Sequence, residues 1–99
     1  MANEFEIELA DDLKVEEPKK CKVFLLNDDY STMDFVIEVL VKVFRKSTEE
    51  SAKIMLNIHN NGRELCGVYT HEIASTKVAQ VKTMARTKGY PLKAVMEEE

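Results

Sequence analysis

The chain has 99 residues, of which 44% are hydrophobic and 32% charged, and its formal net charge is −4. This length predicts one small domain, and this composition is typical of a globular protein. The longest nearly apolar stretch, residues 35–44, includes two charged residues and is too short to span a bilayer, so we expect no membrane segment. The first twenty residues show no secretory signal pattern. The expected location is the cytoplasm.

Charge is unevenly distributed along the chain. Residues 1–18 carry seven acids and one base, residues 97–99 are glutamates, and the span between them carries eight acids and 13 bases. A basic span can indicate a nucleic acid partner. These bases are scattered, however, and no strand combines them with aromatic residues. A solvated surface without nucleic acid is therefore the expected interpretation.

The first 18 residues are predicted to be a flexible acidic extension ahead of a folded core at residues 19–99, which has a short acidic end. Within the extension, Phe5, Ile7 and Leu9 alternate with acids. This alternation can pair as a strand on a partner. A solubilising tail and a docking segment both remain open.

The folded region begins with a predicted strand at residues 21–26, whose nearly continuous apolar run indicates burial on both faces. A helix start follows, with Ser31 as the expected N-cap and Asp34 as its reciprocal acceptor. The helix is expected at residues 33–46. Its apolar residues surround most of its circumference, so it should be largely buried.

A second capping box, Ser47 with Glu50, starts a helix that is expected to run to about residue 59 and to end at Gly62. A strand at residues 63–69 follows. Its two faces are predicted to carry Leu65, Gly67 and Tyr69 on one side, and Cys66 and Val68 on the other. Gly67 inside the strand indicates a bulge or a close approach.

Thr70 is the expected cap of a third helix, which carries a one-sided apolar stripe and stops at Gly89. A last short strand is expected at residues 92–96. The predicted order is β-α-α-β-α-β, and the fold class is an α+β sandwich in which three helices cover one side of a three-stranded antiparallel sheet. Cys21 and Cys66 are expected to be reduced and buried.

Polar residues stand where the first strand passes to the first helix: Asn27, Asp28 and Asp29. Such junctions often carry binding residues. Ionised aspartates only accept hydrogen bonds, and an amide both accepts and donates, so the cluster suits an ammonium group. His59, at the end of the second helix, can add an acceptor, and nearby methionines would give a pocket with a polar mouth and an apolar floor.

Structural explanations of the same residues stand beside this one. An Asn-Asp-Asp turn commonly caps local backbone, methionines at helical spacing are commonly core residues, and a histidine at a helix end commonly interacts with the helix dipole. Zinc binding has no supporting ligand spacing. A hydrolase using Asp28, Asp29 and His59 lacks a visible nucleophile. We therefore expect no enzyme activity, no metal and no cofactor.

Longer segments carry a family resemblance. The stretch VFLLNDDYSTMDFVIEVL, the stretch MLNIHNNGRELCGVYTHEIASTKVAQV and the late YPLKAVME closely resemble the ClpS family. This family comprises small bacterial adaptors of the ClpA unfoldase in the ClpAP protease. The resemblance covers residues 22–96, and its motifs occur in family order. It implies an adaptor that binds substrates of the N-end rule, whose first residue is Leu, Phe, Tyr or Trp, and delivers them to ClpA.

The resemblance also implies roles for individual residues. The residues expected to hold the free α-amino group are Asn27, Asp28 and His59, with Asp29 in support. Ser31 matches a position near the peptide backbone. The apolar pocket for the first side chain is expected to comprise Met33, Val36, Met55, Ile58 and Leu92. Met33 corresponds to a gate that disfavours β-branched residues, and Glu72 and Lys77 match the surface that meets the unfoldase N-terminal domain.

Two positions depart from the common family pattern: Thr32 stands where proline is frequent, and Ile58 where valine is frequent. The first predicts a less rigid loop, and the second adds a methylene to the pocket wall. A different function also remains open. A protein-interaction module similar to the factor-binding domain of the ribosomal stalk would need neither an amine pocket nor a free N-terminus in its partner.

Overall fold

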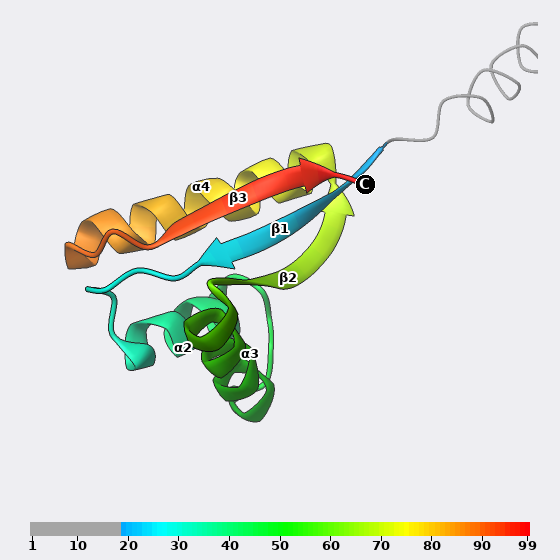
Figure 1. Cartoon of the computed structure of the whole chain (residues 1–99). Helices are drawn as coiled ribbons and strands as arrows, with labels where there is room; N and C mark the ends of the chain where they lie inside the picture. Colours follow the sequence, from blue (N-terminus) through cyan, green and yellow to red (C-terminus); the bar gives the residue numbers. More distant parts are fainter. Residues whose placement is uncertain (1–18) are drawn as a thin grey trace, which may run out of the picture.

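The structure, a computed structural model, describes residues 19–99 (Figure 1). The predicted extension, residues 1–18, lies outside the described residues. The elements in chain order are β1 Lys20–Leu26, α2 Met33–Lys42, α3 Thr48–Asn61, β2 Arg63–Thr70, α4 His71–Lys88 and β3 Lys93–Glu98. This β-α-α-β-α-β order and the antiparallel sheet confirm the predicted fold class.

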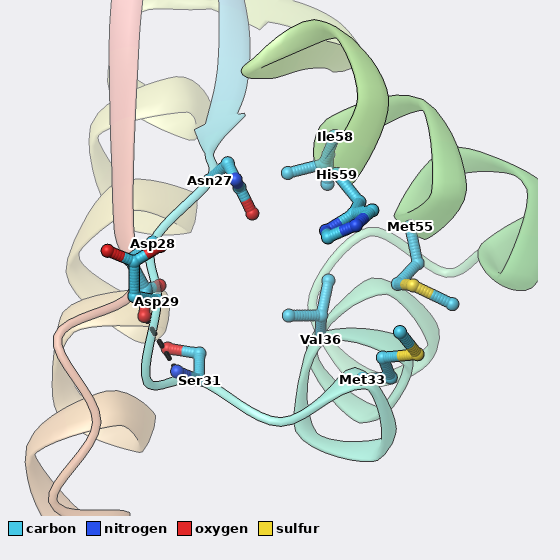
Figure 2. A pocket seen from close by; sticks show the side chains of 9 residues that line it. All are labelled: Asn27, Asp28, Asp29, Ser31, Met33, Val36, Met55, Ile58 and His59. Atoms are coloured by element: carbon cyan, nitrogen blue, oxygen red, sulfur yellow. Dashed lines mark hydrogen bonds between the residues drawn. The ribbon is translucent and has the colours of Figure 1, made fainter.

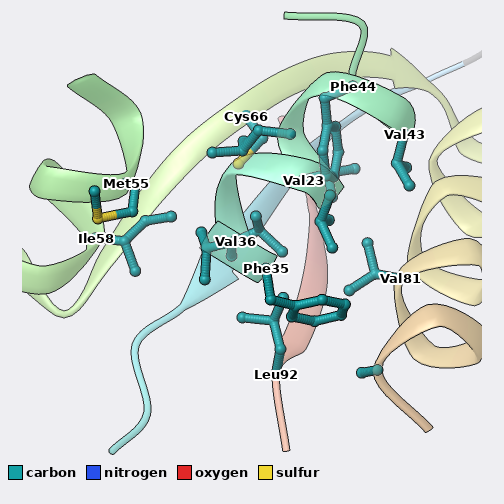
Figure 3. Packing of buried hydrophobic residues seen from close by; sticks show 14 of the residues in the cluster. Val23, Phe35, Val36, Val43, Phe44, Met55, Ile58, Cys66, Val81 and Leu92 are labelled. Atoms are coloured by element: carbon teal, nitrogen blue, oxygen red, sulfur yellow. The ribbon is translucent and has the colours of Figure 1, made fainter. Parts of the chain in front are cut away.

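The sheet has the order β2-β1-β3, with β1 antiparallel to both neighbours. Cys21, Val23 and Leu25 of β1 are almost completely buried, whereas the residues between them are half-buried. Side chains of α2 and α4 meet those of β1 on one face of the sheet (Figure 3). The prediction that β1 is buried on both faces is therefore wrong, because the three helices cover only one face and side chains alternate along a strand.

The outer face of β1 explains why its sequence looks uniformly apolar. Phe24 points to this face, and the guanidinium carbon of Arg63 lies 4.2 Å from the centre of its ring. The same guanidinium donates to Glu97 at 2.8 Å. A cation over an aromatic face is favourable, and it shields Phe24 from water in place of a helix.

A β-bulge in β2 changes which residues face the core. Val23 pairs with Gly67 but Phe24 pairs with Leu65, so Cys66 is an extra residue in β2. Cys66 is buried while Val68 is exposed, and the predicted shared face for these two is wrong because the bulge interrupts the alternation. The Tyr69 ring lies so close to Gly67 that a Cβ there would clash with it. The predicted close approach at Gly67 is confirmed.

The first helix begins and ends at different residues from those predicted. Thr32, and not Ser31, is the N-cap, since its hydroxyl accepts from the Phe35 N–H at 3.1 Å. The helix ends at Lys42 rather than residue 46, because Arg45 takes a left-handed conformation with φ of 58°. The Lys46 N–H then donates to the Leu40 carbonyl at 3.1 Å, which closes the turn.

The other boundaries follow the sequence signals more closely. Ser47 caps α3 by accepting from the Glu50 N–H, and Gly62 ends α3 in the left-handed region with φ of 87°. Gly89 ends α4 in the same way with φ of 77°. The last strand begins at Lys93, not at residue 92, and extends to Glu98, because its pairing with β1 continues to the Cys21–Glu98 pair.

Two further observations concern the described residues. Cys21 and Cys66 are free and buried, as predicted, and burial raises the pKa of the Cys66 thiol to about 12. Within residues 19–99, none of the helices has the length and apolar character needed to cross a membrane.

Candidate functional site

A cavity of about 230 Å³ opens where the loop after β1 meets α2 and the end of α3 (Figure 2). Its lining consists of nine residues: Asn27, Asp28, Asp29, Ser31, Met33, Val36, Met55, Ile58 and His59. All nine were singled out in the sequence, and no other described residue lines this cavity. The structure thus brings together residues that lie up to 32 positions apart in the chain.

The mouth of the cavity is built by joining the end of β1 to the end of α3. The Asn27 N–H donates to the Gly62 carbonyl at 2.8 Å. Because Gly62 caps α3, this bond sets Asn27 beside the last turn of the helix, where His59 lies. The side chains of Asn27 and His59 point toward each other across the opening (Figure 2).

Asp28 holds the loop in shape. Its Oδ1 accepts from the backbone N–H groups of Tyr30 at 2.8 Å and Ser31 at 2.6 Å. Burial tends to raise the pKa of Asp28, but the hydrogen bonds from Ser31 and Tyr30 together outweigh it, and the pKa lies below its usual value of 3.8. Asp28 is therefore ionised at neutral pH and supplies a negative charge at the mouth.

One oxygen of Asp28 therefore caps the local turn, as the structural explanation of the Asn-Asp-Asp segment predicts. It does not exclude binding, because a carboxylate has two oxygens and several acceptor positions. Asn27, Asp29 and His59 are exposed and keep their side chains available to solvent. The structure records no hydrogen bond within residues 19–99 for these three side chains.

The floor of the cavity is apolar. Val36, Met55 and Ile58 are each less than a tenth exposed. They belong to two different helices, α2 and α3, so the floor is fixed by packing between rigid elements. Met33 lies at the edge, in the first turn of α2, with 54% of its surface exposed. An exposed methionine beside a buried floor can change conformation without disturbing the core.

The hydroxyl of Ser31 has an unusual environment. Its Oγ is buried and makes no hydrogen bond of good geometry within residues 19–99, although it lies close enough to the Asp28 carboxylate to help lower the pKa of Asp28. Buried polar atoms are normally paired, and leaving one unpaired costs about 1–3 kcal/mol. Since Ser31 lines the cavity, its hydroxyl is positioned for a polar group of a bound molecule.

Three further residues named from the resemblance do not line this cavity, and only Leu92 was expected to do so. Leu92 is buried, but it lines a second cavity between α4 and β3 and not the first one. Glu72 is exposed in the first turn of α4. Lys77 is half-buried: its Nζ donates to the Val43 carbonyl at 2.6 Å and lies 5.6 Å from the centre of the Tyr69 ring. Lys77 thus supports the end of α2 from within the molecule.

The first cavity suits a small group that is cationic at one end and apolar at the other. The mouth offers carboxylate, amide and imidazole acceptors, and the floor offers aliphatic and thioether surface. An ammonium group has three donors and no acceptor, which matches the mouth.

Comparison with known proteins places these features in a family. The family model described as ATP-dependent Clp protease adaptor protein ClpS matches residues 16–95. The chain belongs to the ClpS family. A ClpS adapter protein of Wolinella succinogenes is 51% identical over 96 residues, which are 97% of this chain and 94% of the relative. One from Maricaulis maris is 55% identical over 83 residues, 84% of this chain and 76% of the relative.

A solved ClpS structure has the same fold. The structure of Agrobacterium tumefaciens ClpS2 bound to L-phenylalaninamide aligns with a TM-score of 0.81 and 37% identity, covering 84% of this chain and all of that one. These comparisons confirm the predicted family and identify this ClpS chain as an adaptor of the Clp protease. They favour this function over the ribosomal-stalk-like module.

Proposed function

We propose that this ClpS chain binds polypeptides whose first residue is Leu, Phe, Tyr or Trp and delivers them to a ClpA-type unfoldase for degradation by ClpAP. The observation that carries the proposal is the joining of two unlike surfaces in one cavity. Acceptors of the loop and of His59 form the mouth, and side chains of α2 and α3 form the floor. Recognition then requires a free amine and a large apolar side chain at once.

The α-amino group is assigned to the mouth. Asp28 supplies the charge, and Asn27 and His59, which face each other across the opening, supply further acceptors. Asp29, exposed on the same loop, adds negative potential without a direct contact. A peptide whose amine is missing or blocked would leave these acceptors unpaired on binding, which is the physical basis of the expected selectivity.

The first side chain is assigned to the floor, against Val36, Met55 and Ile58, with Met33 at the edge. The unpaired Ser31 hydroxyl is assigned to the backbone of the bound peptide. The relative from Agrobacterium tumefaciens supports these assignments, because the L-phenylalaninamide bound to it has a free amine, an aromatic side chain and an amide in place of a peptide bond.

Delivery is assigned to the start of α4. Glu72 and the neighbouring Ile73, which is 49% exposed, form an accessible surface for the N-terminal domain of the unfoldase. Lys77 is half-buried beside this surface, and its Nζ donates to the Val43 carbonyl at the end of α2, which would hold α4 in place for the contact. The adaptor performs no reaction itself, and its proposed location is the cytoplasm, with the protease.

Titration of the 15N-labelled full chain with L-phenylalaninamide tests the binding site. We expect amide shifts to concentrate at residues 27–33 and 55–59. L-Alaninamide keeps the amine but lacks the large side chain, and it should cause much weaker shifts at the same concentration. Shifts elsewhere, or equal shifts with the two amides, would contradict the proposal.

Delivery is tested by degradation of a Leu-starting substrate in a reconstituted ClpAP reaction. The full chain should accelerate degradation, and Glu72→Ala should reduce this effect while leaving peptide affinity unchanged. Glu49→Ala, an exposed acid in the first turn of α3, is the matched control and should behave as the wild type. Equal delivery by the Glu72→Ala protein would move the unfoldase contact to another surface.

A further inference from the structure

The cavity that contains Leu92 is separate from the proposed peptide site and shares no residue with it. It has a volume of about 420 Å³ and lies between α4 and β3. Its interior is apolar, with Val78, Leu92 and Ala94 among its lining residues. Apolar cavities of this size commonly hold a side chain or a ligand, and the core of the described residues does not fill this one.

The charged residues that line this second cavity, called the groove below, are all cationic. Lys82 and Arg86 project from α4, Lys93 projects from β3, and no acidic residue lines the groove. None of these three cations forms an ion pair with an acid of residues 19–99. An occupant with apolar groups and negative charges would complement both the interior and the rim.

The groove also borders an open edge of the sheet. In the order β2-β1-β3, β3 pairs only with β1 on one side, and its other edge has no strand partner within the described part of the chain. Figure 1 shows β3 running along α4 at this edge. An unpaired edge presents backbone groups that can accept an added strand.

We propose that residues 4–9 of this same chain dock in this groove alongside β3. Their sequence, EFEIEL, alternates apolar and acidic residues. Because side chains alternate along a strand, Phe5, Ile7 and Leu9 would enter the groove together while the glutamates face the opposite way. Lys93 pairs with Leu26 in the register and so lies on the outer face, where those glutamates would be.

The connecting segment is long enough for this docking. Ten residues, 10–19, separate Leu9 from Lys20, the first residue of β1. Fully extended, they reach roughly 36 Å. The groove begins beside Lys93, opposite Leu26 at the far end of β1, about 20 Å along the sheet from Lys20. A tether of this length gives an effective concentration in the millimolar range, so even a weak contact is populated.

Docking of the segment is a property of the chain alone and does not depend on the proposed peptide recognition. A nitroxide attached at Asn3→Cys in the full chain tests it by NMR, since the native cysteines are each only 1% exposed and will not be labelled. We expect amide signals at residues 82–94 to lose most of their intensity, and signals of α3 to keep theirs. Absent or uniformly spread losses would overturn the proposal.

Two controls make the result specific. Lys93→Glu, which reverses the charge beside the docked glutamates, should restore most of the lost intensity. Lys53→Glu, an equal charge change at an exposed position of α3, should restore none, and equal effects of the two would overturn the proposal. Mixing 15N-labelled protein without the nitroxide with unlabelled protein that carries it should leave residues 82–94 unaffected. Losses in the mixture would show docking onto a second copy and overturn docking within one chain.

Discussion

Two of the cavities in residues 19–99, the proposed peptide site and the groove between α4 and β3, have apolar interiors but opposite charge at the rim. The first, between the loop and the helices α2 and α3, has Asp28 and Asp29 at its mouth. The second, between α4 and β3, is bordered by Lys82, Arg86 and Lys93. The apolar interior thus does not distinguish their ligands. In the two proposals, the polar atoms at the rim make this distinction: carboxylates favour an amine in the first cavity, and cations favour an acidic segment in the second.

The cavities also differ in how their walls are held. The mouth of the first is fixed by the bond from Asn27 to Gly62 and by the turn that Asp28 forms. The second lies at a sheet edge that is open on one side. A preorganised site loses less conformational freedom on binding, so the first cavity is the better place for selective recognition of a small group.

The largest expected effect is on the free energy of unfolding, and it should arise at the second cavity without changing peptide binding at the first. Leu92→Ala removes a buried side chain from the second cavity and should lower the free energy of unfolding by about 2–5 kcal/mol. Because Leu92 does not line the first cavity, the affinity of the folded protein for a Phe-starting peptide should change by less than about twofold. Urea unfolding and peptide titration measure the two quantities. A large affinity loss in the folded variant would instead place Leu92 in the peptide pocket.

Asp28→Asn tests the charge at the mouth. The amide oxygen can still accept from Tyr30 and Ser31, so the turn is kept while the negative charge is lost. Leaving the ammonium without its charged partner costs about 1–3 kcal/mol, which predicts a loss of affinity of roughly fivefold to 150-fold. Asp34→Asn, an exposed acid of α2 outside the cavity lining, should bind as the wild type. Equal affinities of both variants would remove Asp28 from the amine site.

Met33→Ala tests the edge of the first cavity. The side chain is more than half exposed, so its loss should change the free energy of unfolding by only about 0.5 kcal/mol. Removing the proposed gate should reduce the preference for Leu-starting over Ile-starting peptides by about tenfold. Leu56→Ala, at an exposed apolar residue of α3 outside the cavity, is the control and should keep the preference. An unchanged ratio in Met33→Ala would refute the gate.

The smallest effect concerns pH. The pKa of Asp28 is lowered in the folded state, so its contribution to stability is present above the unfolded pKa and is lost as pH falls through the folded pKa. Between about pH 6 and pH 3, the wild type should therefore lose more stability than Asp28→Asn does. Urea unfolding at the two pH values gives the comparison. Equal losses would show that the turn hydrogen bonds do not favour the ionised form.

Local signals in the sequence predicted most element boundaries. Ser47 with Glu50, Gly62 and Gly89 all act as the capping rules indicate, because each depends only on neighbouring backbone. The predicted cap Ser31 is wrong by one residue, because the Thr32 hydroxyl accepts from the Phe35 N–H, whereas the Ser31 N–H donates to the Asp28 carboxylate in the preceding turn. The covered face of β1 and the bulge at Cys66 depend on contacts distant in the chain, which periodicity does not reveal.

The candidate site could be predicted from residue chemistry together with the family resemblance, and not from local signals alone. Residue chemistry alone made Asn27, Asp28 and His59 capable of holding an amine, but sequence spacing did not show that they meet. The family resemblance supplied that step, and nine of the ten residues expected near its mouth and floor line the cavity, Leu92 being the exception. Leu92 shows the limit of such transfer, since it lines another cavity in this chain. The expected unfoldase contact of Glu72 and Lys77 stays a prediction.

The central claim is that the first cavity recognises a free α-amino group together with a large apolar side chain. Affinity for a labelled Leu-starting peptide, measured with its N-terminus free and then acetylated, tests this most directly. The two peptides share the same side chain, so only the contacts to Asn27, Asp28 and His59 differ. We predict that acetylation lowers affinity by about a hundredfold or more, because it removes the charge and leaves the acceptors of the mouth covered by the peptide but unpaired. Equal affinities for the two peptides would contradict the account.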